Sequence, residues 1–199
     1  MNVLFENVSW MTYNISLGII AVVLGWFALK SRSKGLRLLF SFAWLLFIPN
    51  TIYMITDVTH FPQQFTPQEG LFKTIIFLQY TFLFFWSVET FVIGLYPMEK
   101  LFLEFKGAYR KIEASAFVVV VNFIIALGVV VGRVQRANSW DVILNPNKVI
   151  ADTLALFYSH DLLLLIFFFW ILNNVVYFSF RNILVRHTRF FVRTILHAT

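Results

Sequence analysis

The sequence contains no cysteine, and this absence excludes disulfide bonds, thiolate catalysis and metal sites with cysteine ligands. Charged residues are also scarce. They make up 13% of the 199 residues, whereas soluble domains carry about 25%. A chain with so little charge departs strongly from the composition of a soluble protein.

Apolar residues take the place of the missing charges. The chain is 59% hydrophobic, contains 25 phenylalanines and has a mean hydropathy of +0.76. We therefore predict one membrane domain, residues 1–199, since a single helical bundle fills a chain of this length. The segment Met1–Trp10 contains no Lys or Arg. It therefore lacks the basic start of a secretory signal, and we expect the first span to stay in the mature protein.

Five segments are long and apolar enough to cross a hydrocarbon core of about 30 Å, which takes about 20 helical residues. They predict an all-α, polytopic bundle of five transmembrane helices. The segment 147–158 is too short to cross, and it follows a turn at Asn145-Pro146-Asn147. We expect an interfacial helix there, or an extension of the last span. The expected spans are Met11–Leu29, Leu36–Ile55, Thr74–Leu95, Ala114–Val131 and Asp161–Phe180.

The basic residues predict the orientation of these spans. Cytoplasmic loops of membrane proteins carry an excess of Lys and Arg, and twelve of the 16 basic residues fall in alternate connections. The N-terminus is therefore expected outside and the C-terminus in the cytoplasm, which fits a protein of the bacterial cytoplasmic (inner) membrane. The twelve are Lys30, Arg32, Lys34, Arg37, Lys100, Lys106, Arg110, Lys111, Arg181, Arg186, Arg189 and Arg193, and the other four are Lys73, Arg133, Arg136 and Lys148. Because the positive charge of the chain, +6 overall, is distributed in this way, we expect no nucleic-acid partner.

The end of the chain predicts a further helix. In 182–197, Arg186, Arg189, Arg193 and His197 recur at helical spacing and the apolar residues fall largely elsewhere on the helix. Such a basic amphipathic helix is expected to lie on the anionic lipids of the inner leaflet. Its alternative role is to bind a protein partner.

A few polar residues fall inside the spans: Glu89, Asn122, Asn173 and Asn174. A carboxylate in lipid is costly, so we expect Glu89 to face the bundle. These residues either relay protons or ions, or clamp helices together by hydrogen bonds; we favour the clamp, because no chain of acids continues across the membrane. The small residues Gly128 and Gly132, four positions apart, predict close approach of another helix.

The outer end of the second span carries a polar stripe. Pro49 interrupts the helix, and Asn50, Tyr53, Asp57 and His60 follow at offsets of 3, 4 and 3 residues. These offsets place all four side chains on one helical face.

A second polar group follows the fourth span. It consists of Arg133, Arg136, Asn138, Trp140 and Asp141. Two arginines on the side where basic residues are scarce need local partners, and Asp57 and Asp141 are the candidates. His160 begins the last span on the same side. We therefore predict that three helix ends deliver these residues to one outer site.

The two polar groups also carry a family resemblance. The patterns Pro49-Asn50-x-x-Tyr53-x-x-x-Asp57-x-x-His60 and Gly132-Arg133-x-x-Arg136-x-Asn138-Ser139-Trp140-Asp141 resemble the bacterial membrane proteins grouped as domain of unknown function 1361. The residues after His60 differ from the Trp-Tyr-Asp expected there. The resemblance implies a small polytopic membrane protein of bacteria, and it implies no activity.

Three functions remain open for the outer site. The first is binding or transport of a small anion or a lipid headgroup, held by Arg133 and Arg136 with neutral donors around them. The second is a membrane-embedded hydrolase or transferase acting on lipid, with a divalent metal held by Asp57, His60, Asp141 and His160. The third is a structural or assembly role, with a protein partner or a second copy of the chain. No cofactor motif is evident beyond this potential metal site.

The charge pattern makes a direct prediction about orientation. A reporter fused after Thr199 is expected to give a cytoplasmic signal, because the segment after the last span is rich in arginine. A signal from the periplasm or the cell exterior would overturn the predicted orientation.

Overall fold

The computed structural model describes residues 2–106, 111–136 and 138–197, and in this part of the chain every regular element is a helix. The prediction of an all-α protein is therefore confirmed. The elements are α1 (Asn2–Lys30), α2 (Lys34–Phe47), α3 (Pro49–Thr56), the 3-10 helix η1 (Asp57–His60), α4 (Phe61–Phe65), α5 (Gly70–Lys106), α6 (Lys111–Val134), α7 (Asp141–Leu144), α8 (Pro146–Leu156) and α9 (His160–His197).

Five helical segments within the described residues have the length and composition needed to cross a membrane. Their number agrees with the sequence prediction and is typical of a multi-pass membrane protein. The segments are Val3–Lys30, Lys34–Phe65, Gly70–Phe105, Ile112–Val134 and His160–Arg186. All five extend beyond the predicted spans, because each helical segment continues past the apolar window. Which end of the chain lies outside remains a prediction.

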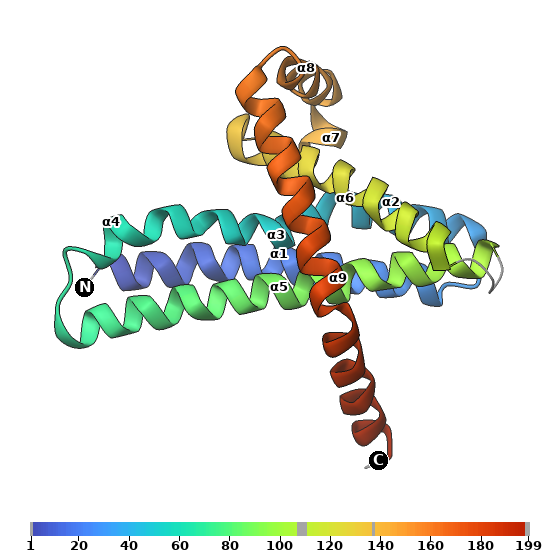
Figure 1. Ribbon diagram of the computed structural model, residues 1–199, viewed down its shortest axis with the longest axis horizontal. Helices are drawn as coiled ribbons and strands as arrows, with labels where there is room; N and C mark the ends of the chain where they lie inside the picture. Colours follow the sequence, from blue (N-terminus) through green and yellow to red (C-terminus); the bar gives the residue numbers. More distant parts are fainter. Residues whose placement is uncertain (1, 107–110, 137, 198–199) are drawn as a thin grey trace.

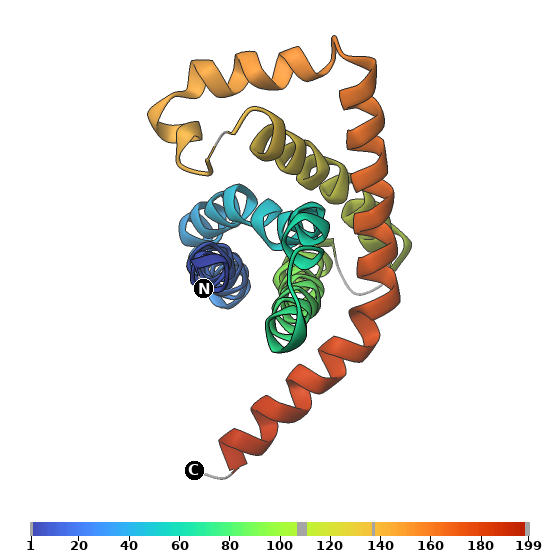
Figure 2. The same cartoon turned by 90° about the vertical axis from the view of Figure 1, so that its left-hand side faces the viewer.

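The helices form two groups (Figure 1). The helix α1, the succession α2–α3–α4 and the helix α5 lie side by side along the long axis. The helix α6 slants away from this three-helix group, and α9 crosses it steeply. Figure 2 views the three-helix group nearly end-on, with α6 and α9 packed along one side of it and α8 running across to the start of α9. The five spans are thus not a set of parallel helices.

Pro49 divides the second span into α2 and α3. It occupies the first turn of α3, where its missing N–H costs no helical hydrogen bond. The neighbouring side chains satisfy the carbonyl groups at the break. The Asn50 amide donates to the carbonyl of Phe47 at 3.0 Å, and the Thr51 hydroxyl donates to the carbonyl of Ile48 at 2.7 Å. The predicted interruption is therefore present, and two carbonyl groups beside it accept hydrogen bonds from side chains of α3.

Gly128 allows α6 to approach this break closely. A Cβ atom on Gly128 would lie 2.7 Å from Cγ of Pro49, closer than real Cβ atoms come to a neighbour. The prediction of a close helix approach at Gly128 is confirmed, and the partner is α3. A hydrogen bond joins α2 to α5: the indole N–H of Trp44 donates to the backbone carbonyl of Gly94 at 2.8 Å.

A buried ion pair joins α5 to α9. The side chain of Glu99 is 2% exposed, and its carboxylate accepts from Arg181 at 2.7 Å and from the hydroxyl of Tyr177 at 2.7 Å. Both carboxylate oxygens are thus paired, as a buried charge requires. This contact fixes α9 where it crosses the three-helix group.

The segment predicted as an interfacial helix contains α8, which ends at Leu156 and is separate from α9. The tail predicted as an amphipathic helix continues α9 as far as His197. The side chains of Arg189, Arg193 and His197 lie outside the described residues, so the amphipathic face stays a prediction.

The tight contact at Gly128 predicts sensitivity to one methyl group. We expect Gly128→Ala to lower the free energy of unfolding by about 1–3 kcal/mol, because the added Cβ would overlap the Pro49 ring. Thermal unfolding in detergent, followed by circular dichroism, measures this. Gly35→Ala is the control, since the nearest atom to its Cβ would be 3.8 Å away. Equal stability of the two variants would contradict the proposed packing.

Candidate functional site

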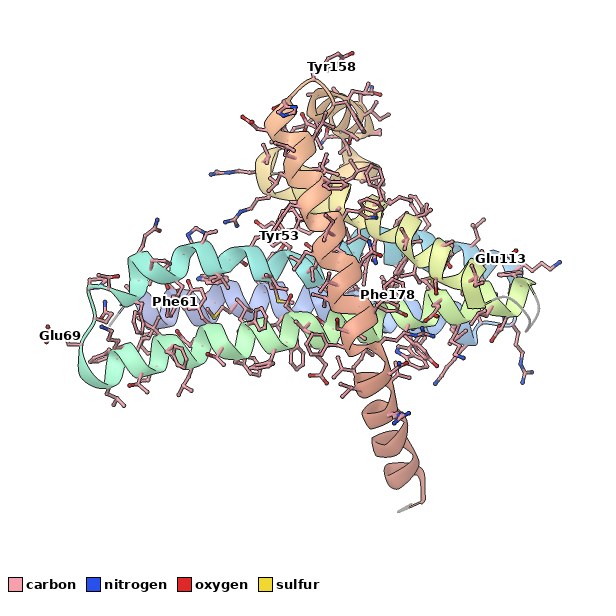
Figure 3. The ribbon with its side chains drawn as sticks, in the orientation of Figure 1. Tyr53, Phe61, Glu69, Glu113, Tyr158 and Phe178 are labelled. Carbon is pink, nitrogen blue, oxygen red and sulfur yellow. The ribbon has the colours of Figure 1, made fainter. Side chains whose placement is uncertain are left out.

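A cavity of about 820 Å³ lies between α1, the α2–α3 break, the end of α6 and the segment from Arg136 to Thr153. Its position beside the middle of the three-helix group is marked by Tyr53 in Figure 3. Seven of the predicted site residues line it: Asn50, Tyr53, His60, Arg133, Arg136, Asn138 and Trp140. The structure thus brings residues from separate helix ends to one cavity, although their role in binding stays a prediction.

Asp57 lies behind the cavity wall and holds Arg133 in place. Its side chain is 6% exposed and forms an ion pair with Arg133 at 3.0 Å. The amide of Asn14 donates to the other carboxylate oxygen at 3.2 Å. Arg133 also donates to the hydroxyl of Thr59 at 2.9 Å. Of the two predicted partners for the arginines, Asp57 is therefore the one that pairs with Arg133.

Two hydrogen-bonded contacts shape the loop after α6. The Asn50 amide donates to the hydroxyl of Ser139 at 3.0 Å, which ties this loop to α3. The backbone N–H of Asn138 donates to the carboxylate of Asp141 at 2.7 Å. Asp141 does not line the cavity; it stabilises the turn into α7 instead.

Arg136 differs from Arg133 in both backbone and surroundings. Its φ is +52°, in the left-handed region that is unfavourable for residues other than glycine. The side chain is exposed and lines the cavity. Among the described residues no carboxylate pairs with it. Arg136 therefore places an uncompensated positive charge at the cavity.

The four residues of the alternative metal site are not assembled into one. Asp57 is engaged by Arg133 and Asn14, and Asp141 by Asn138. His60 lines the cavity, whereas His160 lies exposed at the start of α9 and does not. Across the described ranges, no three His, Asp or Glu side chains are grouped closely enough to hold a metal ion. The geometry therefore does not support the hypothesis of a metal-dependent hydrolase or transferase.

Three of the four polar residues predicted inside the membrane meet between α6 and α9. The Asn122 amide donates to the side-chain carbonyl of Asn174 at 3.0 Å, and the Asn173 amide donates to the backbone carbonyl of Asn122 at 3.2 Å. These bonds join two spans, as expected of a hydrogen-bonded clamp.

The expectation for Glu89 is wrong. Its side chain is exposed on α5, and no described residue hydrogen-bonds or pairs with its carboxylate. The reason is its position on the helix. Glu89 lies 4 and 7 residues after Phe85 and Phe82, which are 66% and 55% exposed, whereas its neighbours Val88 and Thr90 are buried. The spacing therefore puts Glu89 on the outward face of α5.

Sequence reasoning missed two sets of polar residues. Glu99 and Tyr177 form the buried contact with Arg181, but Glu99 was placed beyond the third span, where a charge needs no partner. Tyr13, Asn14 and Thr153 complete the polar lining of the cavity. The signal for Asn14 was available, since a polar residue inside the first span calls for a partner in the bundle.

The cavity is suited to binding an anion. Arginine and the neutral donors of Tyr53 and Asn138 face a space large enough for a small molecule. Asp57 is already paired with Arg133. The positive charge of Arg136 has no such partner among the described residues.

One family of known proteins matches the chain. The family described as "Protein of unknown function (DUF1361)" matches residues 13–176, which include every predicted residue of the cavity. No curated protein and no solved structure matches the chain.

The ion pair between Asp57 and Arg133 predicts a coupled loss of stability. We expect Asp57→Asn or Arg133→Gln alone to cost about 3 kcal/mol, because each leaves a largely buried polar partner unpaired. The double variant is expected to lose less than the sum of the two, as measured by unfolding in detergent. Strictly additive losses would show that the two side chains do not interact in solution.

Proposed function

We propose a function for this chain, which belongs to the DUF1361 family of proteins of unknown function: its cavity binds a small anionic group and either holds it or assists its transport. The group is a phosphate or a carboxylate, carried by a soluble molecule or by a lipid headgroup. The protein acts as a multi-pass protein of the bacterial cytoplasmic membrane, with the cavity on the extracytoplasmic side.

The observation that carries this proposal is the contrast between the two arginines. Arg133 is neutralised by Asp57 at 3.0 Å, so its charge is satisfied within the protein. Arg136 lines the same cavity without a described acidic partner, on a backbone of positive φ. Guanidinium groups bind phosphate and carboxylate through two parallel hydrogen bonds. A ligand anion is the partner that Arg136 lacks.

The neutral residues of the cavity support the same chemistry. Asn50 is held by its bonds to Phe47 and Ser139, and Tyr53 lies beside Arg133, whose guanidinium stacks over the tyrosine ring at 5.5 Å. Asn50 uses both amide N–H groups in these bonds and fixes the cavity wall, whereas the Tyr53 hydroxyl accepts from Arg133 and keeps its own O–H for a ligand, without reordering. The broken helix at Pro49 borders the cavity, an arrangement that many transporters use at their substrate sites.

The side of the membrane follows from the charge pattern. Eight of the twelve clustered basic residues lie in the α1–α2 and α5–α6 connections or in the helix ends beside them, and these are expected in the cytoplasm. Along the second span, Asn50, Tyr53 and His60 lie progressively farther from its predicted cytoplasmic end. The cavity therefore belongs to the outer half of the protein.

A structural role explains part of this site. The pair of Asp57 and Arg133 holds η1 against the end of α6, and it needs no ligand to do so. A structural role does not account for Arg136. Its left-handed backbone conformation costs about 1–2 kcal/mol in a residue that has a side chain. Substitution of Arg136 therefore distinguishes a binding role of this cavity from a purely structural one.

The test is binding of inorganic phosphate and of acetate to the detergent-purified protein, measured by calorimetry. Arg136→Gln is expected to weaken binding of the preferred anion about tenfold or more, since a hydrogen bond to a charged group contributes about 1.5–3 kcal/mol. Arg136→Lys is expected to retain part of the affinity, because it keeps the charge but loses the planar fork.

The control is Lys148→Gln, which removes an exposed positive charge that does not line the cavity. It is expected to bind as the wild type does. Equal affinity of Arg136→Gln and wild type, or an equal loss in the Lys148→Gln control, would contradict the proposal.

A further inference from the structure

The cavity lining is sorted along each of three helices. On α1, the polar residues Tyr13 and Asn14 are followed by Leu17. On the second span, Leu45 and Leu46 come before the polar residues Asn50 and Tyr53. On α6, Ile124 and Leu127 come before Arg133, and Arg136 follows just beyond the end of the helix.

The directions of the helices make this order meaningful. The helix α1 and the α2–α3 succession run in opposite directions along the same axis (Figure 1), and α6 leads from the end where α2 begins towards the loop that holds Arg136. Polar lining residues therefore gather at one end of the cavity and apolar residues at the other. A cavity built for a hydrated ion alone has no need of the apolar end.

The volume leads to the same conclusion. A water molecule takes about 30 Å³ of liquid, so a phosphate group of five heavy atoms fills only a small part of a cavity of about 820 Å³. The polar end suffices for such a group. The other end is bordered by leucine and isoleucine side chains of α1, α2 and α6. A ligand that fills it must carry an apolar portion.

The apolar end also borders the surface that lipid covers. Ile124 is 42% exposed, and Leu17 and Leu46 are half-buried and belong to neither packed core cluster. The helix α6 packs more closely against α3, α5, α8 and α9 than against α1 or α2. Leu46 on α2 and Ile124 on α6 lie on opposite sides of the space between these helices, and both line the cavity. An alkyl chain could thus enter sideways from the bilayer.

We propose that the ligand is an anionic phospholipid, with its headgroup at Arg136 and an acyl chain along Leu46 and Leu17. This inference rests on the proposed function, because the headgroup is the anion that Arg136 binds. Trp140, which lines the cavity and is 39% exposed, suits the position, since tryptophan favours the interface between headgroups and acyl chains.

The absence of native cysteine makes a single introduced thiol a specific probe. The Leu46→Cys variant in detergent is treated with N-ethylmaleimide, alone and with phosphatidylglycerol, phosphatidylcholine or inorganic phosphate. Phosphatidylglycerol is expected to slow the labelling several-fold, because its acyl chain covers position 46. Inorganic phosphate is expected to leave the rate unchanged, because it fills only the polar end.

Two controls make the test specific. The Leu38→Cys variant, on the same helix, replaces a side chain that is 74% exposed and does not line the cavity, so phosphatidylglycerol should not slow its labelling. Adding Arg136→Gln to Leu46→Cys is expected to remove the protection, because the headgroup then loses its charged partner.

The outcomes separate the two proposals. If inorganic phosphate binds in a manner that depends on Arg136 but phosphatidylglycerol does not protect position 46, the lipid is excluded and the anion site stands. Equal protection by phosphatidylcholine would likewise overturn an anionic lipid as the ligand. If neither the binding of phosphate nor the protection by phosphatidylglycerol depends on Arg136, the proposed function itself fails.

Discussion

Pro49 and Gly128 meet where the second span breaks, and this contact determines how α6 lies against the three-helix group. The proline ring occupies the space that a side chain at position 128 would need. Because α3 and α6 touch there, the end of α6 reaches the polar face of α3 and η1, and Arg133 comes within 3.0 Å of Asp57. The loop that follows is then tied to α3 through Asn50 and Ser139. Without the close contact between α3 and α6, Arg133 and Ser139 would not reach their partners on η1 and α3.

The same geometry gives the two arginines different roles. Arg133 belongs to a helix end and is neutralised by a buried carboxylate, so it contributes to the stability of the wall. Arg136 stands three residues later, beyond the helix, where the chain turns with a positive φ. No described acidic residue pairs with Arg136, so under the proposed function it is the residue available to a ligand, beside a wall held by the ion pair of Asp57 and Arg133.

The sequence predicted much of this arrangement, for identifiable reasons. Runs of apolar residues define the five long helices, and the offsets from Asn50 to His60 put one face of the second span towards a common site. Side-chain direction within a uniformly apolar helix was not predictable: α5 is apolar on every face, so Glu89 could be assigned to the bundle although it points outward. The steep crossing of α9 was not predictable either, because it depends on the buried contact of Glu99 with Tyr177 and Arg181. Long-range pairs of this kind leave no periodic pattern in the sequence.

The length of the three-helix group has a consequence for the bilayer around it. The helix α5 has 37 residues, which correspond to about 55 Å at about 1.5 Å per residue. At the end where α1 begins, Asn7 is fully buried and hydrogen-bonds to Gln64 and Gln79, and Gln64 also accepts from Tyr80. The length of α5 exceeds the hydrocarbon core of about 30 Å, so part of the three-helix group must extend beyond it. The polar cluster, together with the exposed charges of Glu6 and Glu69, indicates that the end where α1 begins extends into the headgroups or water.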